Sequence, residues 1–368
     1  MRILHAADLH LDSPFEGLSA GKAALRRGEQ RDLLYRLANL AANEKADVVL
    51  LAGDLLDSDK AFRETAEDLV RSLSMINVPV FISPGNHDWY SSKCPYAKVR
   101  FPENVRIFKK QEIEAVELEN CNAVVYGAAF TGKHSEALTD GFKVPEQFAD
   151  KINIMCIHGE YGNRESLYNP VSEEKIAGSG LDYLALGHIH KASGLLKTGG
   201  TYVSWPGCPE GRGFDETGVK YVNIIDLEKG SCSLSQISIS SRKYEILYVD
   251  VTDTDPVLAI HASIPDETVK DVYRIVLRGE TDEFLDLNRI KRSLSDLFFE
   301  YRIKDETRLK RNIWDSAGDD SLRGLFLAKM MKRYDSAKTE SEKKAIESSV
   351  RWGLAAIDNA EEVCVHEN

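Results

Sequence analysis

Residues 1–14 read MRILHAADLHLDSP, an apolar run that ends abruptly in Asp8, Leu9 and His10. The run from Ile3 to Ala7 has the continuous hydrophobicity of a buried β-strand. A carboxylate and an imidazole two residues apart at the end of a strand are unusual, and both groups bind divalent metals. The same ending recurs further along the chain.

Four later apolar runs, DVVLLA, VPVFISP, INIMCI and YLALG, end alike. Each is followed at once by residues that can ligate a metal: Gly53-Asp54, Gly85-Asn86-His87-Asp88, His158 and His188-Ile189-His190, in that order. Apolar residues at helical spacing, within 33–41 and 62–73, separate the first three runs. Alternating strands and helices indicate a parallel sheet, and ligands bind at the carboxyl ends of its strands. We therefore expect the five clusters to meet.

The joint pattern, rather than any single residue, argues for a site. A lone histidine at a strand end is most often structural, and Gly-Asp and Asn are common in turns. Five of the nine histidines nevertheless lie at these strand ends, whereas His5 is expected to point into the core. Carboxylate, amide and imidazole ligands suit Mn²⁺, Fe²⁺ or Zn²⁺. Two ions about 3.5–4 Å apart can clamp a phosphoryl displacement, and Asp54 is the natural bridging carboxylate.

The motif set D-x-H, GD-x-x-D, GNHD, H and GHxH resembles that of the calcineurin-like metallophosphoesterase superfamily over about residues 1–240. Within it, HAADLHLDSPF and the chain length resemble the SbcD/YhaO-type branch of DNA-repair nucleases. The resemblance implies an α/β fold, a two-sheet sandwich flanked by helices. It also implies two ions, the first held by Asp8, His10, Asp54 and His190, and the second by Asp54, Asn86, His158 and His188.

The resemblance further implies catalytic roles for two residues beside the ions. His87 would stabilise the transition state or act as general acid, and Asp88 would orient its ring. Asp57 stands where archaeal and eukaryotic break-repair nucleases carry a second histidine, and a carboxylate there is no cationic phosphate contact. The protein phosphatase branch is disfavoured, because its GD-x-V-D-R-G and GNHE motifs read GDLLDSD and GNHD here.

The chain is expected to form three parts. They are a nuclease domain at 1–240, a small α/β cap domain at 241–312 and C-terminal helices within 313–368. In the first part we expect a hairpin at 112–130 and strands at 201–206, 218–226 and 231–239 that complete the second sheet. In the other parts we expect strands at 243–251 and 272–279 and helices at 287–301, 321–335 and 340–358. The Gly-rich loop 204–218 either walls the active site or lies on the surface.

A basic stretch at 91–111 follows GNHD directly and holds six Lys or Arg against one acid, Glu103. Its aromatic residues are Trp89 and Tyr90, just before it, and Tyr96, Phe101 and Phe108 within it. Basic groups contact phosphates and aromatic rings stack on unpaired bases, although a solvated loop with core aromatics would have the same composition. We expect the stretch to bind the DNA backbone.

The composition and net charge of the chain limit the functional classes to which it can belong. The 368-residue chain has no long apolar run, no signal-like N-terminus and six scattered cysteines without a C-x-x-C pair, so a cytoplasmic protein that does not span a membrane is expected. A net charge of −12 argues mildly against an extended DNA groove and favours a rival, a small-nucleotide phosphodiesterase. A second rival, a non-catalytic scaffold, would be expected to have lost ligands, and all seven are kept.

We predict a dinuclear phosphodiesterase of DNA ends in DNA repair, with Mn²⁺ expected and Fe²⁺ or Zn²⁺ as alternatives. The resemblance implies a partner, an SbcC-like coiled-coil ATPase, which would dock on the C-terminal helices. An apolar stripe at helical spacing there is the expected contact, and it comprises Leu322, Leu325, Phe326 and Met330. The alternative is that this stripe packs within its own chain. A homodimer is left open.

Overall fold

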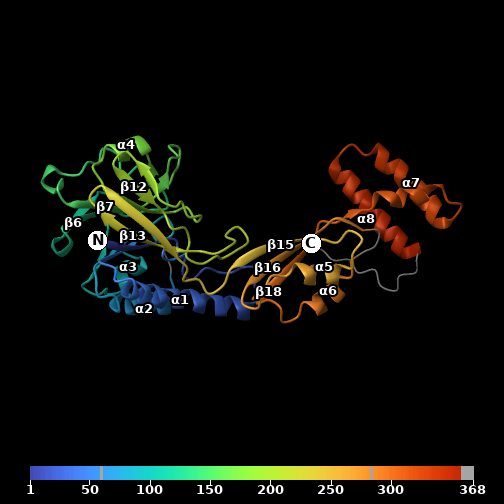
Figure 1. Ribbon diagram of the computed structural model, residues 1–368, viewed down its shortest axis with the longest axis horizontal. Coiled ribbons are helices and arrows are strands. Elements are labelled where there is room, and N and C mark those ends of the chain that lie inside the picture. The colour runs from blue at the N-terminus through green and yellow to red at the C-terminus, as the bar shows by residue number, and fades with distance from the viewer. Residues whose placement is uncertain (59–60, 282–284, 358–368) are drawn as a thin grey trace. The chain divides into compact units, whose positions relative to one another are not determined.

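The computed structural model describes residues 1–58, 61–281 and 285–357. The chain forms two compact units, Met1–Lys243 and Tyr244–Asn368, and each is an α/β structure in its own right (Figure 1). The cap domain and the C-terminal helices predicted from the sequence both lie in the second unit.

The first unit is built around two six-stranded sheets. The first sheet has the order β14-β13-β1-β2-β3-β4. Its strands are β1 (Arg2–Ala6), β2 (Val48–Leu51), β3 (Val80–Ile82), β4 (Val105–Ile107), β13 (Val222–Glu228) and β14 (Ser231–Ile237). Strands β1 to β4 run parallel, whereas β13 pairs antiparallel with β1 and β14 pairs antiparallel with β13. The predicted place of these last two strands in the second sheet is wrong, because β13 pairs along the free edge of β1.

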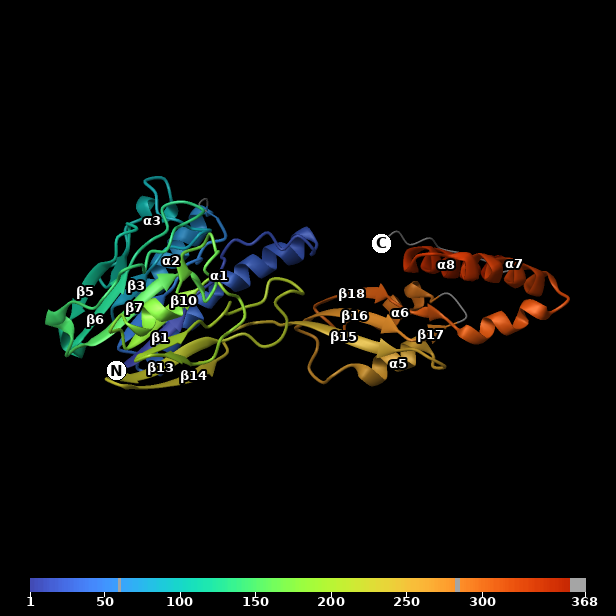
Figure 2. The same cartoon turned by 90° about the horizontal axis from the view of Figure 1, so that it is seen from above.

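The second sheet has the order β11-β12-β10-β7-β6-β5. Its strands are β5 (Glu114–Leu118), β6 (Ala123–Gly127), β7 (Ile152–His158), β10 (Tyr183–Gly187), β11 (Leu196–Thr198) and β12 (Thr201–Ser204). Strands β6, β7, β10 and β12 are parallel, and β5 and β6 form the predicted hairpin. Figure 2 shows strands of both sheets, among them β1, β3, β13 and β14 of the first and β5, β6, β7 and β10 of the second. Strands β7 and β10 thus bring their histidines from a different sheet than β1, β2 and β3.

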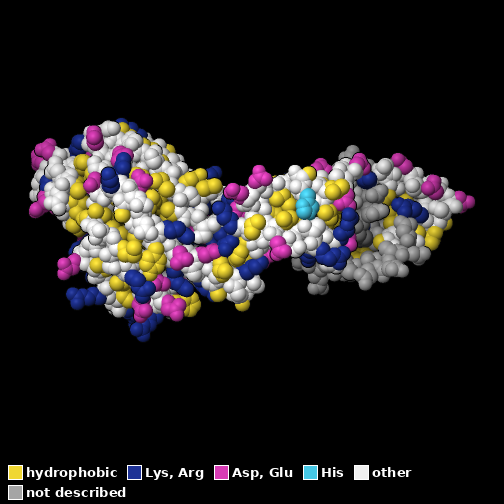
Figure 3. Space-filling view, turned by 60° about the horizontal axis from the view of Figure 1, so that its bottom comes forward, with side chains coloured by type: hydrophobic (Ala, Val, Ile, Leu, Met, Phe, Trp, Pro, Cys, Tyr) yellow, Lys and Arg dark blue, Asp and Glu magenta, His cyan; other side chains and the backbone are white. Residues whose placement is uncertain are grey.

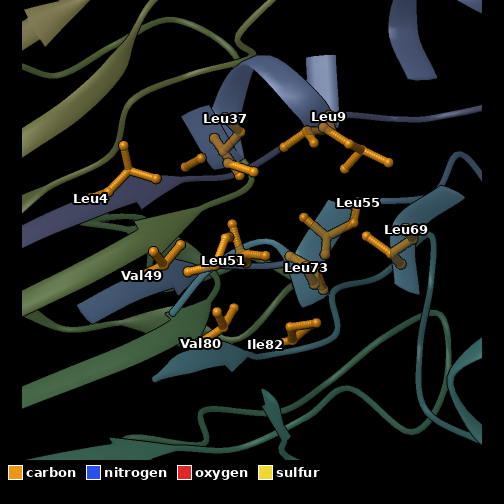
Figure 4. Close-up of a cluster of buried hydrophobic side chains, with 14 of the residues drawn as sticks. Leu4, Leu9, Leu37, Val49, Leu51, Leu55, Leu69, Leu73, Val80 and Ile82 are labelled. Atoms are coloured by element: carbon orange, nitrogen blue, oxygen red, sulfur yellow. The ribbon is translucent and has the colours of Figure 1, made fainter. Parts of the chain in front are cut away.

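Two of the three apolar layers of this unit include residues of β1 and β2. Helices α1 (Ala20–Asn43) and α2 (Arg63–Ser74) cover the outer face of the first sheet, where buried leucines of the helices meet those of β1 and β2 (Figure 4). The inner faces of the two sheets form a second layer that includes Ile3, Phe81 and Tyr183. Because both layers are anchored on β1 and β2, the loops that follow these strands start from fixed positions. The shorter elements of the unit are α3 (Pro95–Lys98), η1 (Glu119–Cys121), η2 (Glu146–Phe148), β8 (Glu160–Tyr161), β9 (Pro170–Val171) and α4 (Glu173–Ala177).

A series of buried hydrogen bonds connects the two sheets. Nε2 of His5 on β1 lies 3.0 Å from the carbonyl of Leu186, and Nδ1 lies 2.9 Å from the hydroxyl of Tyr183. That hydroxyl is 2.6 Å from Ser204 Oγ. A buried histidine needs such partners, and burial lowers the pKa of His5 to about 3. The prediction that His5 points into the core is confirmed.

The second unit starts with a parallel sheet of β15 (Tyr244–Asp250), β16 (Val272–Arg278) and β18 (Glu300–Asp305). Helices α5 (Pro256–Ser263) and α6 (Leu287–Ser293) pack on one face of it. The predicted helix 287–301 is therefore too long: Asp296 has a φ of 66°, and Glu300 already pairs with Val272 of β16. Strands β17 (Glu280–Thr281) and β19 (Arg308–Leu309) form a separate parallel pair.

The C-terminal helices of the second unit form a small core of their own. Helices η3 (Arg311–Gly318), α7 (Leu322–Ser336) and α8 (Glu340–Ile357) lie around Leu327, Val350 and Leu354. Met330 is 7% exposed and belongs to this core, whereas Leu322 and Leu325 are 70% and 65% exposed. The expectation of one continuous exposed stripe is thus wrong for Phe326 and Met330, which pack within the chain. The last predicted helical residue, 358, lies outside the described residues.

Lys and Arg are interspersed with Asp and Glu on the face shown in Figure 3. No helix in the part of the chain that the structure describes is long and apolar enough to cross a membrane.

Candidate metal centre

The strand ends of both sheets bring the predicted ligands together. Three groups of side chains have ligand atoms within 4.8 Å of one another. They are Asp8 with His10 and His190, Asp54 with His158 and His188, and His10 with Asp54 and His87. The seventh predicted ligand, Asn86, joins the second group through its amide oxygen. Residues from five strands thus form one site, as expected.

The backbone at the site is strained. Four of the predicted ligands have a left-handed backbone, with φ of 54° at Asp8, 45° at His10, 50° at Asp54 and 99° at His188. Such conformations are costly for residues other than glycine and persist only where the surroundings impose them. Here the main-chain N–H of Asp8 donates to Gly53 O and that of His10 to Asp54 O, each at 3.0 Å. Strain of this kind clusters at functional sites.

The glycines of the GD and GNHD motifs are required by close approach. A Cβ on Gly53, whose φ is 87°, would lie 2.5 Å from Nδ1 of His158. A Cβ on Gly85 would lie 2.3 Å from Oδ1 of Asp54. Both contacts are shorter than side chains tolerate, so only glycine lets these ligands meet.

In the first ligand set, two imidazoles face each other through Nε2 atoms that carry no proton when both rings are neutral. Nδ1 of His10 lies 3.0 Å from Oδ1 of Asp57, and Nδ1 of His190 lies 2.7 Å from Oε1 of Glu216. Each Nδ1–H therefore donates to a carboxylate, which leaves both Nε2 atoms as acceptors. These two atoms are only 3.1 Å apart. Two neutral imidazoles in these tautomers repel each other there. Burial disfavours a charged His190, but Glu216 outweighs this effect and raises the pKa of His190, so either a proton on His190 or a divalent ion between the rings removes the conflict.

The second ligand set also brings possible ligand atoms close together. Nδ1 of His158 donates to the carbonyl of Ala52 at 2.9 Å, so its Nε2 faces Asn86 Oδ1 at 2.9 Å and Asp54 Oδ2 at 3.4 Å. Nδ1 of His188 lies 3.1 Å from the same Asn86 oxygen. Oxygen and nitrogen acceptors thus converge on one point, where either a proton or a divalent ion is needed. This donor set fits an ion of the Mn²⁺, Fe²⁺ or Zn²⁺ class, and so does the first.

Burial and neighbouring charges set the proton affinities in the absence of an ion. Burial raises the pKa of Asp8 to about 6 and lowers that of His10 and His188 to about 4. Burial also disfavours the charged ring of His158, but Asp54 outweighs this effect and raises the pKa of His158 to about 9. Likewise, His158 and His10 overcome the burial of Asp54 and hold its pKa well below the usual range. A proton on Nε2 of His158 thus takes the place of an ion.

His87 and Asp88 have different roles from one another. His87 is exposed, its ring lies 4.7 Å from that of His10, and its Nδ1 donates to the carbonyl of Asp57 at 3.0 Å. Asp88 is fully buried and accepts from the main-chain N–H of Gly85 at 2.7 Å and of Leu55 at 2.8 Å, and from the Tyr96 hydroxyl. The predicted orientation of the His87 ring by Asp88 is therefore corrected: the Asp57 carbonyl holds the ring. Asp88 ties the loops after β2 and β3 together.

Three residues that support the ligands were not identified from the sequence. They are Asp57 in its contact with His10, and Arg212 and Glu216 in the loop 204–218 beside His190. Burial of Glu216 opposes its ionisation, but His190 and Arg212 hold its pKa well below the usual range. The position of the loop directly after GHIH was the available signal, and it did not distinguish a site wall from a surface loop.

The basic stretch 91–111 divides into exposed charges and buried rings. All six of its basic side chains are exposed, and they are Lys93, Lys98, Arg100, Arg106, Lys109 and Lys110. Phe108 and Tyr96, by contrast, belong to the core, so these two rings are not available to stack on bases. Tyr90 lies under Lys109, whose Nζ is 5.8 Å from the ring centroid.

Comparisons with known proteins agree with this geometry. The profile of the calcineurin-like phosphoesterase family matches residues 1–192. The uncharacterised metallophosphoesterase YhaO of Bacillus subtilis is 28% identical over 340 residues, which cover 87% of this chain and 81% of YhaO. The DNA double-strand break repair protein Mre11 of Saccharolobus solfataricus is 25% identical over 331 residues, 83% of each chain. The SbcD component of the SbcCD nuclease of B. subtilis is 26% identical over 283 residues, 66% of this chain and 71% of that one.

The family profile covers more than half of the chain and includes the ends of all five ligand-bearing strands. The same strand ends carry the converging carboxylate, amide and imidazole groups. The chain therefore belongs to the calcineurin-like phosphoesterase family and is a metal-dependent phosphoesterase, a hydrolase.

Proposed function

We propose that the chain is a dinuclear phosphodiesterase that cleaves DNA at its ends during DNA repair. The observation that carries this proposal is the convergence of two groups, Asp8 with His10 and His190 and Asp54 with His158 and His188, beside the exposed His87. Oδ2 of Asp54 lies 3.8 Å from Nε2 of His10, so Asp54 is the proposed shared ligand. When bound, the two ions supply Lewis acidity and clamp the attacking and leaving oxygens of a phosphoryl displacement. Mn²⁺ is the ion proposed, because carboxylate and amide oxygens share the site with imidazole nitrogens.

His87 is the proposed general acid. Its Nδ1–H is taken up by the carbonyl of Asp57, so Nε2 is the nitrogen that can hold a proton for the departing oxygen. The main-chain N–H of His87 also donates to Asp54 Oδ1 at 2.9 Å, which fixes the residue against the shared ligand. Asp88 acts indirectly, by holding the loops that carry His87 and Asp54 in register.

Support for a DNA substrate comes from two directions. Two of the relatives are, by name, a DNA double-strand break repair protein and a component of a nuclease. In this chain, six exposed basic side chains directly follow the loop that carries Asn86 and His87. Exposed lysines and arginines beside a phosphodiesterase centre suit the DNA backbone.

The acidic net charge of −12 favours the second candidate, a phosphodiesterase for a small nucleotide. Incubation of the purified protein with Mn²⁺ and labelled duplex ends, DNA hairpins or cyclic nucleotides separates the two. Faster cleavage of the DNA substrates supports the proposal, whereas preferential hydrolysis of cyclic nucleotides supports the second candidate. Hydrolysis of none of them, nor of a chromogenic diester, would favour the non-catalytic scaffold.

We propose that an SbcC-like coiled-coil ATPase is the partner, docked on α7 through Leu322 and Leu325. Both side chains are largely exposed, and the rest of the predicted stripe packs inward. Exposed leucines on one helix face are suited to an apolar groove or a partner helix. A cytoplasmic location is proposed as well, supported by the five free cysteines of the described residues.

A further inference from the structure

The loop between β12 and β13 is in direct main-chain contact with the proposed metal centre. The main-chain N–H of Cys208 donates to the carbonyl of His190 at 3.2 Å. Gly207 has a φ of 73°, and a Cβ there would lie 2.4 Å from the same carbonyl. The loop therefore begins in direct contact with one of the proposed ligands.

The far side of the loop is anchored on helix α1. Glu210 is buried, pairs with the buried Arg26 and accepts from the main-chain N–H of Ser241 at 3.0 Å. Arg26 also donates to the carbonyl of Gly211 at 3.2 Å. Buried ions paired in this way hold a fixed geometry, because either one alone would be costly. These contacts fix the position of Arg212, the next residue of the loop.

Arg212 connects two carboxylates that each hold a histidine of the first ligand set. Its Nη1 donates to Asp57 Oδ1 at 3.1 Å, and its Nη2 donates to Glu216 Oε1 at 2.6 Å. The same two oxygens accept from Nδ1 of His10 and of His190. The five side chains thus form a closed ring of contacts, which the two facing Nε2 atoms of His10 and His190 complete.

Arg212 is not placed to bind substrate. Both arms of its guanidinium are engaged, and with Asp57 and Glu216 the trio carries a net charge of −1. Nη2 also lies 3.2 Å from His190 Nδ1, but that bond would require the opposite tautomer of the imidazole, and the contact with Glu216 is shorter, at 2.7 Å. Planar, two-armed guanidinium geometry suits the bridging of two carboxylates in a way that an ammonium group does not.

We propose that Arg212 is a positioning residue of the metal centre, which holds Asp57 and Glu216 so that His10 and His190 offer Nε2 to the ion they share with Asp8. This role rests on the dinuclear centre proposed above. Residues that orient metal ligands from outside typically change metal affinity by about 10–100-fold when they are mutated. The ion held by Asn86, His158 and His188 has no part in this ring.

The test is a Mn²⁺ titration of the full chain that resolves the two binding events. Arg212→Met should weaken one site by about 10–100-fold and leave the other unchanged, and Arg212→Lys should recover part of the loss. Arg31→Met is the matched control, because Arg31 has a similarly covered side chain, 25% exposed against 19%, and pairs with Asp68 on α2. This control should leave both sites unchanged.

Equal affinity of both sites in Arg212→Met and wild type would overturn the role of Arg212. Equal weakening of both sites, or loss of folding in Arg212→Met together with an unchanged titration in Arg212→Lys, would also overturn it, because a general structural effect would then be at work. A wild-type chain that binds fewer than two ions would instead overturn the dinuclear centre itself, and this role with it.

Discussion

His87 differs from the histidines around it in being exposed, and it belongs to neither proposed ligand set. Because its ring nitrogen is bound to a main-chain carbonyl, its removal should disturb the ligands little. We expect His87→Ala to keep both ions and to lose hydrolysis by about 10²–10⁴-fold, the usual contribution of a general acid. Metal analysis and diester hydrolysis measure the two effects. A loss below about tenfold, or loss of an ion, would contradict the assigned role.

Protons and ions compete for the same atoms at this site. In the metal-free protein His158 has a pKa of about 9 and Asp8 one of about 6. Between these values an incoming ion must displace the proton of His158, so the apparent affinity should rise about tenfold per pH unit, steepen below pH 6 and level off above pH 9. Calorimetry in buffers of different ionisation enthalpy counts the released proton. A flat affinity from pH 6.5 to 8.5 would refute this linkage.

The convergence of the proposed ligands could be predicted from the sequence, whereas the side chains that hold them in place could not. Asp8, Asp54 and His158 each follow an apolar run, a local signal that one sequence displays. Arg212 and Glu216 reach His190 through a loop whose path depends on a buried ion pair with α1. Such a contact between distant segments leaves no periodic trace. The same holds for Asp88, whose partners are main-chain groups of a neighbouring loop.

Among the secondary-structure elements, the positions of the strands in the sequence were easier to predict than the order in which the strands pair in the sheets. The runs at β1, β2, β3, β7 and β10 were identified because buried strands are continuously apolar. The sheet that β13 and β14 join is decided by which edge is free, and the sequence does not encode that locally. Helix α6 ends early for a similar reason, since pairing of β18 with β16 outweighs the helical pattern that continues to residue 301.

The stretch 91–111 should act as one DNA-binding element. Changing Lys98, Arg100 and Lys109 to Glu should weaken DNA cleavage far more than hydrolysis of a chromogenic diester, because only the polymer reaches these exposed charges. Each lost phosphate contact should flatten the salt dependence of binding by about one unit of slope. The same reversal at Lys45, Lys151 and Lys229, which lie next to the opposite strand ends, is the control. Equal loss on both substrates would argue against a DNA-specific contact.

At the scale of the molecule, the site and the proposed partner surface belong to different compact units. All seven proposed ligands lie within Met1–Lys243, and the exposed leucines of α7 lie in the second unit. We expect Leu322→Glu combined with Leu325→Glu to abolish co-purification with the ATPase while metal content and diester hydrolysis stay unchanged. Met331→Glu, exposed on another side of α7, should leave the complex intact.

Deletion of 321–368 should have the same effect on the partner and should also spare the metal centre. It exposes Leu309 and Ile313, which pack against these helices, so the point variants are the cleaner test. Continued co-purification of the double variant would show that the leucines are not the contact. Loss of metal in the truncated chain would show instead that the helices support the first unit.

In the proposed metal centre, two ions share Asp54 between two ligand sets. Anomalous diffraction from crystals loaded with Mn²⁺ tests it most directly, because it locates each ion without reference to activity. We predict two peaks about 3.5–4 Å apart, one beside Asp8, His10 and His190 and the other beside Asn86, His158 and His188, with Asp54 contacting both. A single peak, or a pair of which only one touches Asp54, would rule out a dinuclear centre bridged by Asp54.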